Sequence, residues 1–284
     1  MGKLEAMKPP ALFSNHRPAI IAALHLPPSP AIGRSSSSAI GGTIDYALRN
    51  AEKAVRAGIP ALYIHDLGDL PAAKHIQPHT IAFLSVVGSK LREEFPDLVL
   101  GICTMSHGAR EPLAIAQAIS AQFVRIKVYT GAMVKAEGIL EGCAHEAITY
   151  RAAIGAEQIT ILADIHDRTG KPLGAVSLAE AARSAAIHNR ADALIVTGSS
   201  FEESMQMLKE VSAENLGVPI LLGGGADDNK IARVLQVAQG AIVSSSFKPI
   251  DGWTHASMRA EWDFNRMLKF MQYVGEYGAP ASDS

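Results

Sequence analysis

The sequence predicts a (β/α)8 barrel, a closed cylinder of eight parallel strands with a helix after each strand. Eight short runs of apolar, often β-branched residues alternate with stretches in which apolar residues recur three and four positions apart. Several runs, such as Ala61–Ile64 and Ala193–Val196, have no polar face, which is typical of parallel strands covered by helices. The length of 284 residues fits one such barrel. A doubly wound open sheet is the competing prediction.

The expected elements follow one another without a domain boundary inside the barrel. The strands are expected at Ile20–Leu26, Ala61–Leu67, Leu98–Thr104, Phe123–Tyr129, Gln158–His166, Ala193–Thr197, Val218–Leu222 and Ala241–Ser245. The helices are expected near Asp45–Ala57, His79–Glu94, Glu111–Ala121, Glu141–Ala153, Leu178–Asn189, Glu202–Ala213, Asp227–Ala238 and Met258–Val274. Gly58, Gly155 and Gly217 each lie between a helix and the next strand, where glycine commonly ends a helix.

The chain divides into one domain and two short ends. We expect an N-terminal extension over residues 1–17, the barrel over 18–275 and a disordered tail over 276–284. The serine run Ser35–Ser38 lies in the first strand-to-helix loop, on the face where barrels of this kind carry their active sites. We expect that loop to be either a lid over the site or an ordinary solvated loop.

Composition excludes several classes of protein. With 48% hydrophobic and 19% charged residues, the chain has enough apolar surface for a large core. A net charge of −2 gives no overall field that attracts nucleic acid or anionic lipid. The apolar run Ala19–Leu24 is too short to span a membrane, and His25 interrupts it, so a buried strand is preferred over a signal peptide. Two cysteines cannot form a disulfide framework, and we expect a cytoplasmic protein.

Charged side chains inside the fourth strand are the first sign of a site. Side chains alternate along a strand, so Arg125 and Lys127 share the face opposite Val124, Ile126 and Val128. The apolar face suits packing against helices, which places Arg125 and Lys127 in the barrel. Asp164, in the next expected strand, is the expected counter-ion, because unpaired buried charge is costly. The alternatives are a purely structural ion-pair layer and a charged floor that binds an anionic substrate.

Catalytic residues in this fold come from the carboxyl ends of strands. His25 and Asp66 end the first two strands, and Asp164 and His166 share a face of the fifth. We expect Lys127, Asp164, His166, Arg125, His25 and Asp66 to form the catalytic set. His166 suits general acid–base catalysis. No cofactor is certain, but a divalent metal held by Asp164 and His166 is an open alternative, with His65 or Asp66 completing its ligands.

The last two strands predict a phosphate site. The seventh strand runs into Gly223, Gly224 and Gly225, and the eighth runs into Ser244 and Ser245. Loops after these strands bind phosphate in many barrels, through backbone N–H groups that glycine lets a ligand approach. Thr197, at the end of the sixth strand, joins this predicted set. By contrast, Cys103 is expected to be a buried apolar residue rather than a nucleophile.

Seven segments of the sequence resemble the BtpA family, which includes the SgcQ-type proteins. These segments are Ala22–Pro30, Leu67–Pro71, Val124–Gly142, Ile161–Leu173, Ala191–Ser199, Val218–Ala226 and Gly240–Gly252. The resemblance implies a barrel of the ribulose-phosphate-binding type. It also connects the chain with photosystem I biogenesis in cyanobacteria and with sugar-phosphate functions of SgcQ-type relatives. His65-Asp66 and the segment Cys103–Gly108 depart from the family pattern, which implies a different substrate or a reduced activity.

Two functions follow from these expectations. The first is an enzyme that acts on a phosphorylated, sugar-like metabolite by isomerase or lyase chemistry, since no redox-cofactor or ATP motif is present. In that case Arg125 holds a substrate carboxylate. The second is a non-catalytic assembly factor, which an exposed apolar patch around Trp253, Trp262 and Phe264 or a plugged cavity would favour. We also expect a homo-oligomer.

Overall fold

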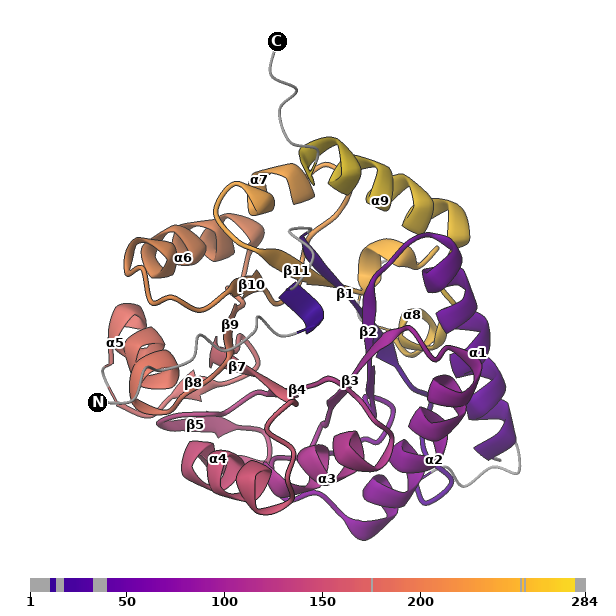
Figure 1. The fold of residues 1–284 in the computed structure, drawn as a ribbon, viewed down its shortest axis with the longest axis horizontal. Coiled ribbons are helices and arrows are strands. Elements are labelled where there is room, and N and C mark those ends of the chain that lie inside the picture. The colour runs from indigo at the N-terminus through magenta and orange to yellow at the C-terminus, as the bar shows by residue number, and fades with distance from the viewer. Residues whose placement is uncertain are drawn as a thin grey trace.

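Eight parallel strands close into a barrel, and helices surround it (Figure 1). The computed structural model describes residues 11–13, 18–32, 40–174, 176–250, 252 and 254–278. Around the barrel the strand order is β1-β11-β10-β9-β7-β4-β3-β2. The strands are β1 (Ala19–His25), β2 (Ala61–His65), β3 (Val99–Cys103), β4 (Phe123–Ile126), β7 (Thr160–His166), β9 (Ala193–Val196), β10 (Ile220–Leu222) and β11 (Gly240–Val243). The predicted barrel is confirmed. The open-sheet alternative is wrong, because β1 pairs with both β2 and β11.

The predicted helices are present, with two differences near the C-terminus. They are α1 (Ile40–Arg56), α2 (Pro78–Glu94), α3 (Arg110–Ala118), α4 (Ala144–Ala153), α5 (Leu178–Arg183) with the π-helical turn η3 (Ser184–His188), α6 (Phe201–Ala213), α7 (Ile231–Leu235), α8 (His255–Arg259) and α9 (Phe264–Gly278). The helix expected from Asp227 begins only at Ile231, because the Asp227 carboxylate accepts the Asn229 N–H in a turn. The single helix expected at the end is divided into α8 and α9.

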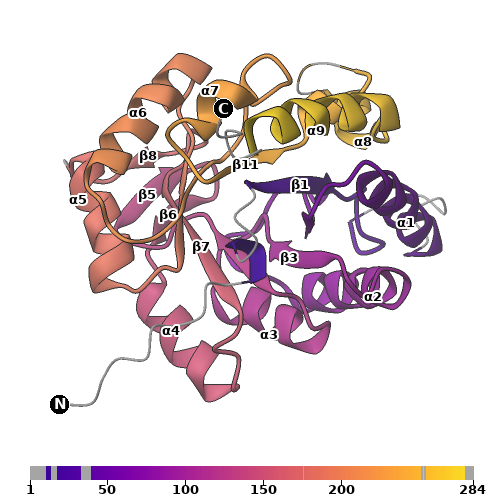
Figure 2. The ribbon, with the colours of Figure 1, turned by 45° about the horizontal axis from the view of Figure 1, so that its top comes forward.

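A three-stranded sheet that the sequence did not predict is formed by two strands after β4 and one strand after β7. It consists of β5 (Ala132–Lys135), β6 (Gly138–Glu141) and β8 (Lys171–Pro172), which Figure 2 shows beside β7. The helix expected from Glu141 therefore begins later, at Ala144. Gly138, with φ of 103°, makes the tight turn between β5 and β6. Met133 and Leu140 pack with Val128 into a small apolar cluster under this hairpin.

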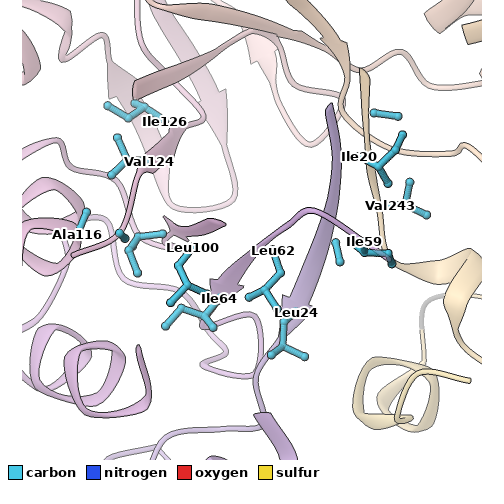
Figure 3. Close-up of a cluster of buried hydrophobic side chains, with 14 of the residues drawn as sticks. Ile20, Leu24, Ile59, Leu62, Ile64, Leu100, Ala116, Val124, Ile126 and Val243 are labelled. Carbon is cyan, nitrogen blue, oxygen red and sulfur yellow. The ribbon is translucent and has the colours of Figure 1, made fainter. Parts of the chain in front are cut away.

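The core has two parts, divided by the alternation of side chains along the strands. Leu62 and Ile64 of β2 belong to the large cluster between strands and helices, part of which Figure 3 shows. Tyr63 belongs to the cluster inside the barrel. Leu12, in the short helix η1 (Ala11–Phe13), joins that inner cluster, and Figure 1 shows η1 at the barrel centre. The inner cluster fills much of the barrel and leaves the carboxyl ends of the strands for a site.

Some expectations concern residues that the structure does not describe. The loop Ser35–Ser38, Trp253 and the last residues of the expected tail lie outside the described residues, and α9 continues to Gly278. The division into extension, barrel and tail stays a prediction. Within the described ranges, no helix combines the length and the apolar character that crossing a membrane requires.

One glycine in the inner layer generates a prediction about stability. Gly101 of β3 lies opposite Phe123 of β4, and a Cβ atom on Gly101 would overlap the Phe123 ring. Phe123 is fully buried, so its ring cannot give way cheaply. We expect Gly101→Ala to lower the free energy of unfolding by about 1–3 kcal/mol in urea denaturation. Gly224→Ala is the control, because open space surrounds Gly224. Equal stability of the two variants would contradict the described packing.

Candidate functional site at the carboxyl ends of the strands

A cavity of about 830 Å³ opens at the carboxyl ends of the strands. Small-molecule sites commonly have volumes of about 300–1,000 Å³. Its walls come from most of the barrel strands, from the tip of the β5–β6 hairpin and from the segment leading into α8. The cavity is open. A cavity plugged by side chains would have favoured an assembly factor, and it is not observed.

Arg125 forms the floor of the cavity, and each of its three guanidinium nitrogens donates to a protein group. Its Nε and Nη2 donate to the two carboxylate oxygens of Asp164 at 3.0 and 2.8 Å, and its Nη1 donates to Tyr63 Oη at 3.0 Å. The Asp164 side chain is completely buried. Burial raises the pKa of its carboxyl, and the Arg125 guanidinium opposes that shift. The expected ion pair is present, but Arg125 has little capacity left to hold a substrate carboxylate.

Lys127, two residues further along, has no carboxylate partner among the described residues. Its Nζ lies 3.1 Å from His65 Nε2 and 3.6 Å from Met105 Sδ. An ammonium group can only donate, so His65 Nε2 accepts and the ring proton sits on Nδ1. Nδ1 is buried and has no hydrogen-bond partner. Lys127 therefore brings a positive charge to the cavity.

Two histidines beside Lys127 are neutral at physiological pH. Burial holds the pKa of His65 well below its usual value, and the Lys127 charge adds to this effect. The pKa of His25 is lowered to about 3, first by burial and then by Lys248, Lys127 and Arg125. The two rings lie edge to face, 5.6 Å apart. Ser244 Oγ lies 3.5 Å from His25 Nδ1. Rings with such low pKa values are weak bases, so they are suited to act as neutral hydrogen-bond partners.

The opposite part of the cavity is a glycine–serine cup. It is formed by Gly223, Gly224, Gly225, Thr197, Ser244 and Ser245. The Gly223 N–H donates to Val196 O at 2.9 Å, whereas the N–H groups of Gly224 and Gly225 have no recorded acceptor within the described part of the chain. The Thr197 hydroxyl is buried without a hydrogen-bond partner. Free N–H and hydroxyl donors at strand ends are suited to bind an oxyanion.

Basic residues outnumber acidic ones around the cavity. Two acidic residues, Glu137 and Asp167, line the cavity. The Asp167 carboxylate accepts hydrogen bonds from Lys135 at 2.6 Å and from Thr169. Burial opposes the shift, but these donors still lower the pKa of Asp167 to about 2. The five cations that line the cavity are Arg125, Lys127, Lys135, Arg168 and Lys248. The excess of positive charge favours an anionic ligand.

Three residues of the expected catalytic set do not line the cavity. Asp164 lies beneath Arg125. Asp66 is buried where its carboxylate accepts the Met105 N–H at 2.7 Å, and burial raises its pKa to about 6. His166 donates through Nδ1 to the Thr197 carbonyl at 2.7 Å. A break in strand register between Asp164 and His166 invalidates the simple alternation that placed both on one face.

The metal site that the sequence left as an alternative at Asp164 and His166 is not formed by these side chains, since both Asp164 oxygens accept from Arg125. No three His, Cys, Asp or Glu side chains in the described ranges are placed to share a metal ion. Cys103 is fully buried, and burial raises the pKa of its thiol, so it is unsuited to nucleophilic attack.

Several cavity residues escaped the sequence analysis. Lys135 and Glu137 come from the unpredicted hairpin, Asp167 follows β7, and Lys248 follows the short helix η4 (Ser245–Phe247). Lys248 Nζ donates to the Ser257 and Met258 carbonyls, both at 2.9 Å, and burial lowers its pKa to about 8. The only sequence signal for Glu137 and Lys248 was their presence in segments that resemble the BtpA family.

The apolar patch expected of an assembly factor is not found at Trp262. Only 2% of Trp262 is exposed, and its ring packs edge-on against Phe247 at 6.1 Å. Phe264 is partly buried, with the Arg56 guanidinium 4.9 Å from its ring centre. Neither residue therefore forms an exposed apolar surface.

The fold is a (β/α)8 barrel, and its cavity is a basic site at the carboxyl ends of the barrel strands. Residues 16–276 match the model of the BtpA family, and the chain belongs to this family. Photosystem I biogenesis protein BtpA of Synechocystis sp. is 28% identical over 271 residues, covering 93% of this chain and 90% of the relative. An uncharacterized protein of Archaeoglobus fulgidus is 31% identical over 231 residues, covering 81% of this chain and 91% of the relative.

Solved structures with the same barrel fold have much lower sequence identity. KGPDC from Streptococcus mutans matches with a TM-score of 0.57 at 12% identity, covering 92% of this chain and 99% of that protein. Phosphoribosyl anthranilate isomerase from Thermus thermophilus matches with a TM-score of 0.53 at 13% identity, covering 90% of this chain and 98% of that protein. These likenesses establish the fold.

The buried ion pair gives a prediction about stability. Asp164→Asn would leave the Arg125 guanidinium in the barrel without a charged partner. We expect a loss of about 3–5 kcal/mol in the free energy of unfolding, measured by urea denaturation. The control is Glu93→Gln, which removes an exposed ion pair with Lys90 and should change stability by less than about 1 kcal/mol. An equally small effect at Asp164 would show that the ion pair contributes little.

The lowered pKa of His25 gives a prediction about pH. Below about pH 6.5 the unfolded chain protonates this ring, whereas the folded protein keeps it neutral down to about pH 3. Its contribution to stability is therefore complete above pH 6.5 and is lost as the pH falls. Between pH 7 and 5, wild type should lose about 2 kcal/mol more stability than His25→Asn in urea denaturation. The exposed His79→Asn variant should keep the wild-type slope.

Proposed function

We propose that this protein is an enzyme that acts on a phosphorylated, sugar-like metabolite by isomerase- or lyase-type chemistry. The observation that carries the proposal is the glycine–serine cup, whose free donors face a large cavity with an excess of basic residues. The cup has the chemistry that a phosphate group requires, and the remaining volume accommodates a polar carbon skeleton.

In this proposal the phosphate binds at the cup. The N–H groups of Gly224 and Gly225 and the hydroxyls of Thr197, Ser244 and Ser245 donate to its oxygens. Side chains larger than glycine would cover these N–H groups, and a Cβ atom on Gly223 would collide with the Thr197 hydroxyl. The cup thereby holds one end of the substrate in a fixed orientation.

The reacting end of the substrate then lies near Lys127. When a proton leaves a carbon next to a carbonyl group, negative charge develops on the carbonyl oxygen, and the nearby positive charge of Lys127 stabilises it without a direct hydrogen bond. The neutral ring of His25 forms a hydrogen bond with a substrate oxygen. His65, whose Nε2 accepts from Lys127 and whose Nδ1 is buried, is a positioning residue for that ammonium group. Glu137, which lines the cavity and forms no recorded ion pair, accepts the carbon-bound proton. Arg125 and Asp164 are positioning residues that hold the floor.

The names of structural neighbours are consistent with this substrate class. One is 3-keto-L-gulonate-6-phosphate decarboxylase from Vibrio cholerae, with a TM-score of 0.56 at 10% identity, covering 93% of this chain and 100% of that protein. At such low identity the support comes from the shared barrel and from the position of our proposed phosphate site after the last two barrel strands.

A non-catalytic assembly role is the alternative, and its support is the name of the Synechocystis relative, a photosystem I biogenesis protein. The open cavity and the buried Trp262 favour the enzyme. A cytoplasmic location and a homo-oligomeric state stay predictions of the sequence analysis.

Ligand-induced stabilisation tests the proposal. D-Ribulose 5-phosphate, D-ribose 5-phosphate and inorganic phosphate, at millimolar concentration, should raise the Tm of wild type in a thermal-shift assay. Gly224→Asp places a carboxylate in the cup and should weaken this binding at least about tenfold by charge repulsion. Gly275→Asp adds the same charge on the exposed surface of α9 and should bind like wild type. A wild type that no phosphorylated compound stabilises would refute the proposal.

A further inference from the structure

The Lys127 ammonium is a cation that the described protein groups do not neutralise. Its two recorded partners, His65 Nε2 and Met105 Sδ, carry no negative charge. The carboxylate on the neighbouring strand, Asp164, already accepts from Arg125 with both oxygens. Lys127 is half-buried and lines the cavity, and an ammonium group partly removed from water attracts an anionic ligand.

The other groups around Lys127 form no ion pair with it in the described part of the chain. Arg125 and Asp164 neutralise each other, and the rings of His25 and His65 are neutral. The Asp66 carboxylate interacts with the Lys127 charge at longer range, but it accepts the Met105 N–H and does not line the cavity. Glu137 lines the same cavity, but the structure records no ion pair between it and Lys127, and its Oε2 is buried without a hydrogen-bond partner. The wall at Lys127 is thus positively charged until a ligand arrives.

Lys127 lies across the barrel from the serine side of the glycine–serine cup. Lys127 follows β4, whereas Ser244 and Ser245 follow β11, and these two strands are four places apart in either direction around the eight-stranded ring (Figure 1). The glycines of the cup follow β10, three places from β4, and Thr197 follows β9, two places from β4. Both walls border the same cavity. A ligand held by its phosphate at the cup therefore extends across the opening toward Lys127.

We infer that the substrate carries a carboxylate at the end opposite its phosphate and that Lys127 binds this carboxylate. Of the three ammonium N–H groups, one is directed to His65 and one to Met105, which leaves one for the ligand. The single free N–H and the single positive charge of Lys127 suit a carboxylate, whereas a second phosphate group would need several hydrogen-bond donors. The inference rests on the proposed function and narrows its substrate class to phosphorylated sugar acids and hydroxy acids.

Matched pairs of compounds test this inference by isothermal titration calorimetry. 3-Phosphoglycerate is compared with glycerol 3-phosphate, and 6-phospho-D-gluconate with D-glucitol 6-phosphate. Each pair differs by a carboxylate in place of a hydroxymethyl group. In at least one pair, wild type should bind the carboxylate about tenfold more tightly, the effect of one charge-assisted hydrogen bond. Lys127→Gln should abolish that preference, so that both members of each pair bind this variant with equal affinity.

Lys171→Gln is the control, because Lys171 is exposed on β8 and does not line the cavity. It should keep the wild-type preference. Binding of all four compounds without any preference for the carboxylates, or a preference that survives in Lys127→Gln, would overturn the inference and leave the phosphate site intact. Failure of all four compounds while D-ribulose 5-phosphate binds would overturn the inference alone, and failure of D-ribulose 5-phosphate as well would refute the proposed function with it.

Discussion

The bidentate ion pair between Arg125 and Asp164 determines how the rest of the cavity is organised. A guanidinium group can lie inside a barrel only if its charge and its donors are satisfied there. Asp164 supplies both oxygens and Tyr63 supplies a third acceptor, so Arg125 becomes a fixed part of the floor. Because Asp164 is used in this way, Lys127 receives no carboxylate. The positive charge that faces a ligand is therefore a consequence of the pairing beneath it.

That charge also sets the protonation of its neighbours. His25 and His65 are buried next to Lys127, and both burial and the nearby cations disfavour a further positive charge. The same region therefore combines one ammonium group with two neutral imidazoles at physiological pH. Across the cavity, the glycine–serine cup offers uncharged donors. A ligand with an anionic end meets two chemically different walls, which is a basis for binding it in one orientation.

The β5–β6 hairpin adds an ammonium group and a carboxylate, those of Lys135 and Glu137, to the cavity wall. The ion pair between Lys135 and Asp167 ties the hairpin to the end of β7, and both side chains are only 9% exposed. The His107 ring bonds the Glu141 carbonyl at 2.7 Å, which links the other side of the hairpin to the loop after β3. These contacts hold Glu137 at the cavity. The family resemblance pointed to this segment, but its chemistry became clear only from its position over the barrel.

The sequence by itself determined the barrel and much of the cavity wall. Alternation along β4 correctly placed Arg125 and Lys127 inside, and the glycines after β10 and the serines after β11 marked the cup, because these signals depend on local geometry alone. The tertiary structure decided which of these groups face a ligand. The break in register in β7 removed His166 from the cavity, burial removed Asp66, and the fold brought in Glu137, Lys248 and His65. Pairing across strands and the path of a hairpin depend on contacts between residues distant in the chain, which the period of a single strand does not contain.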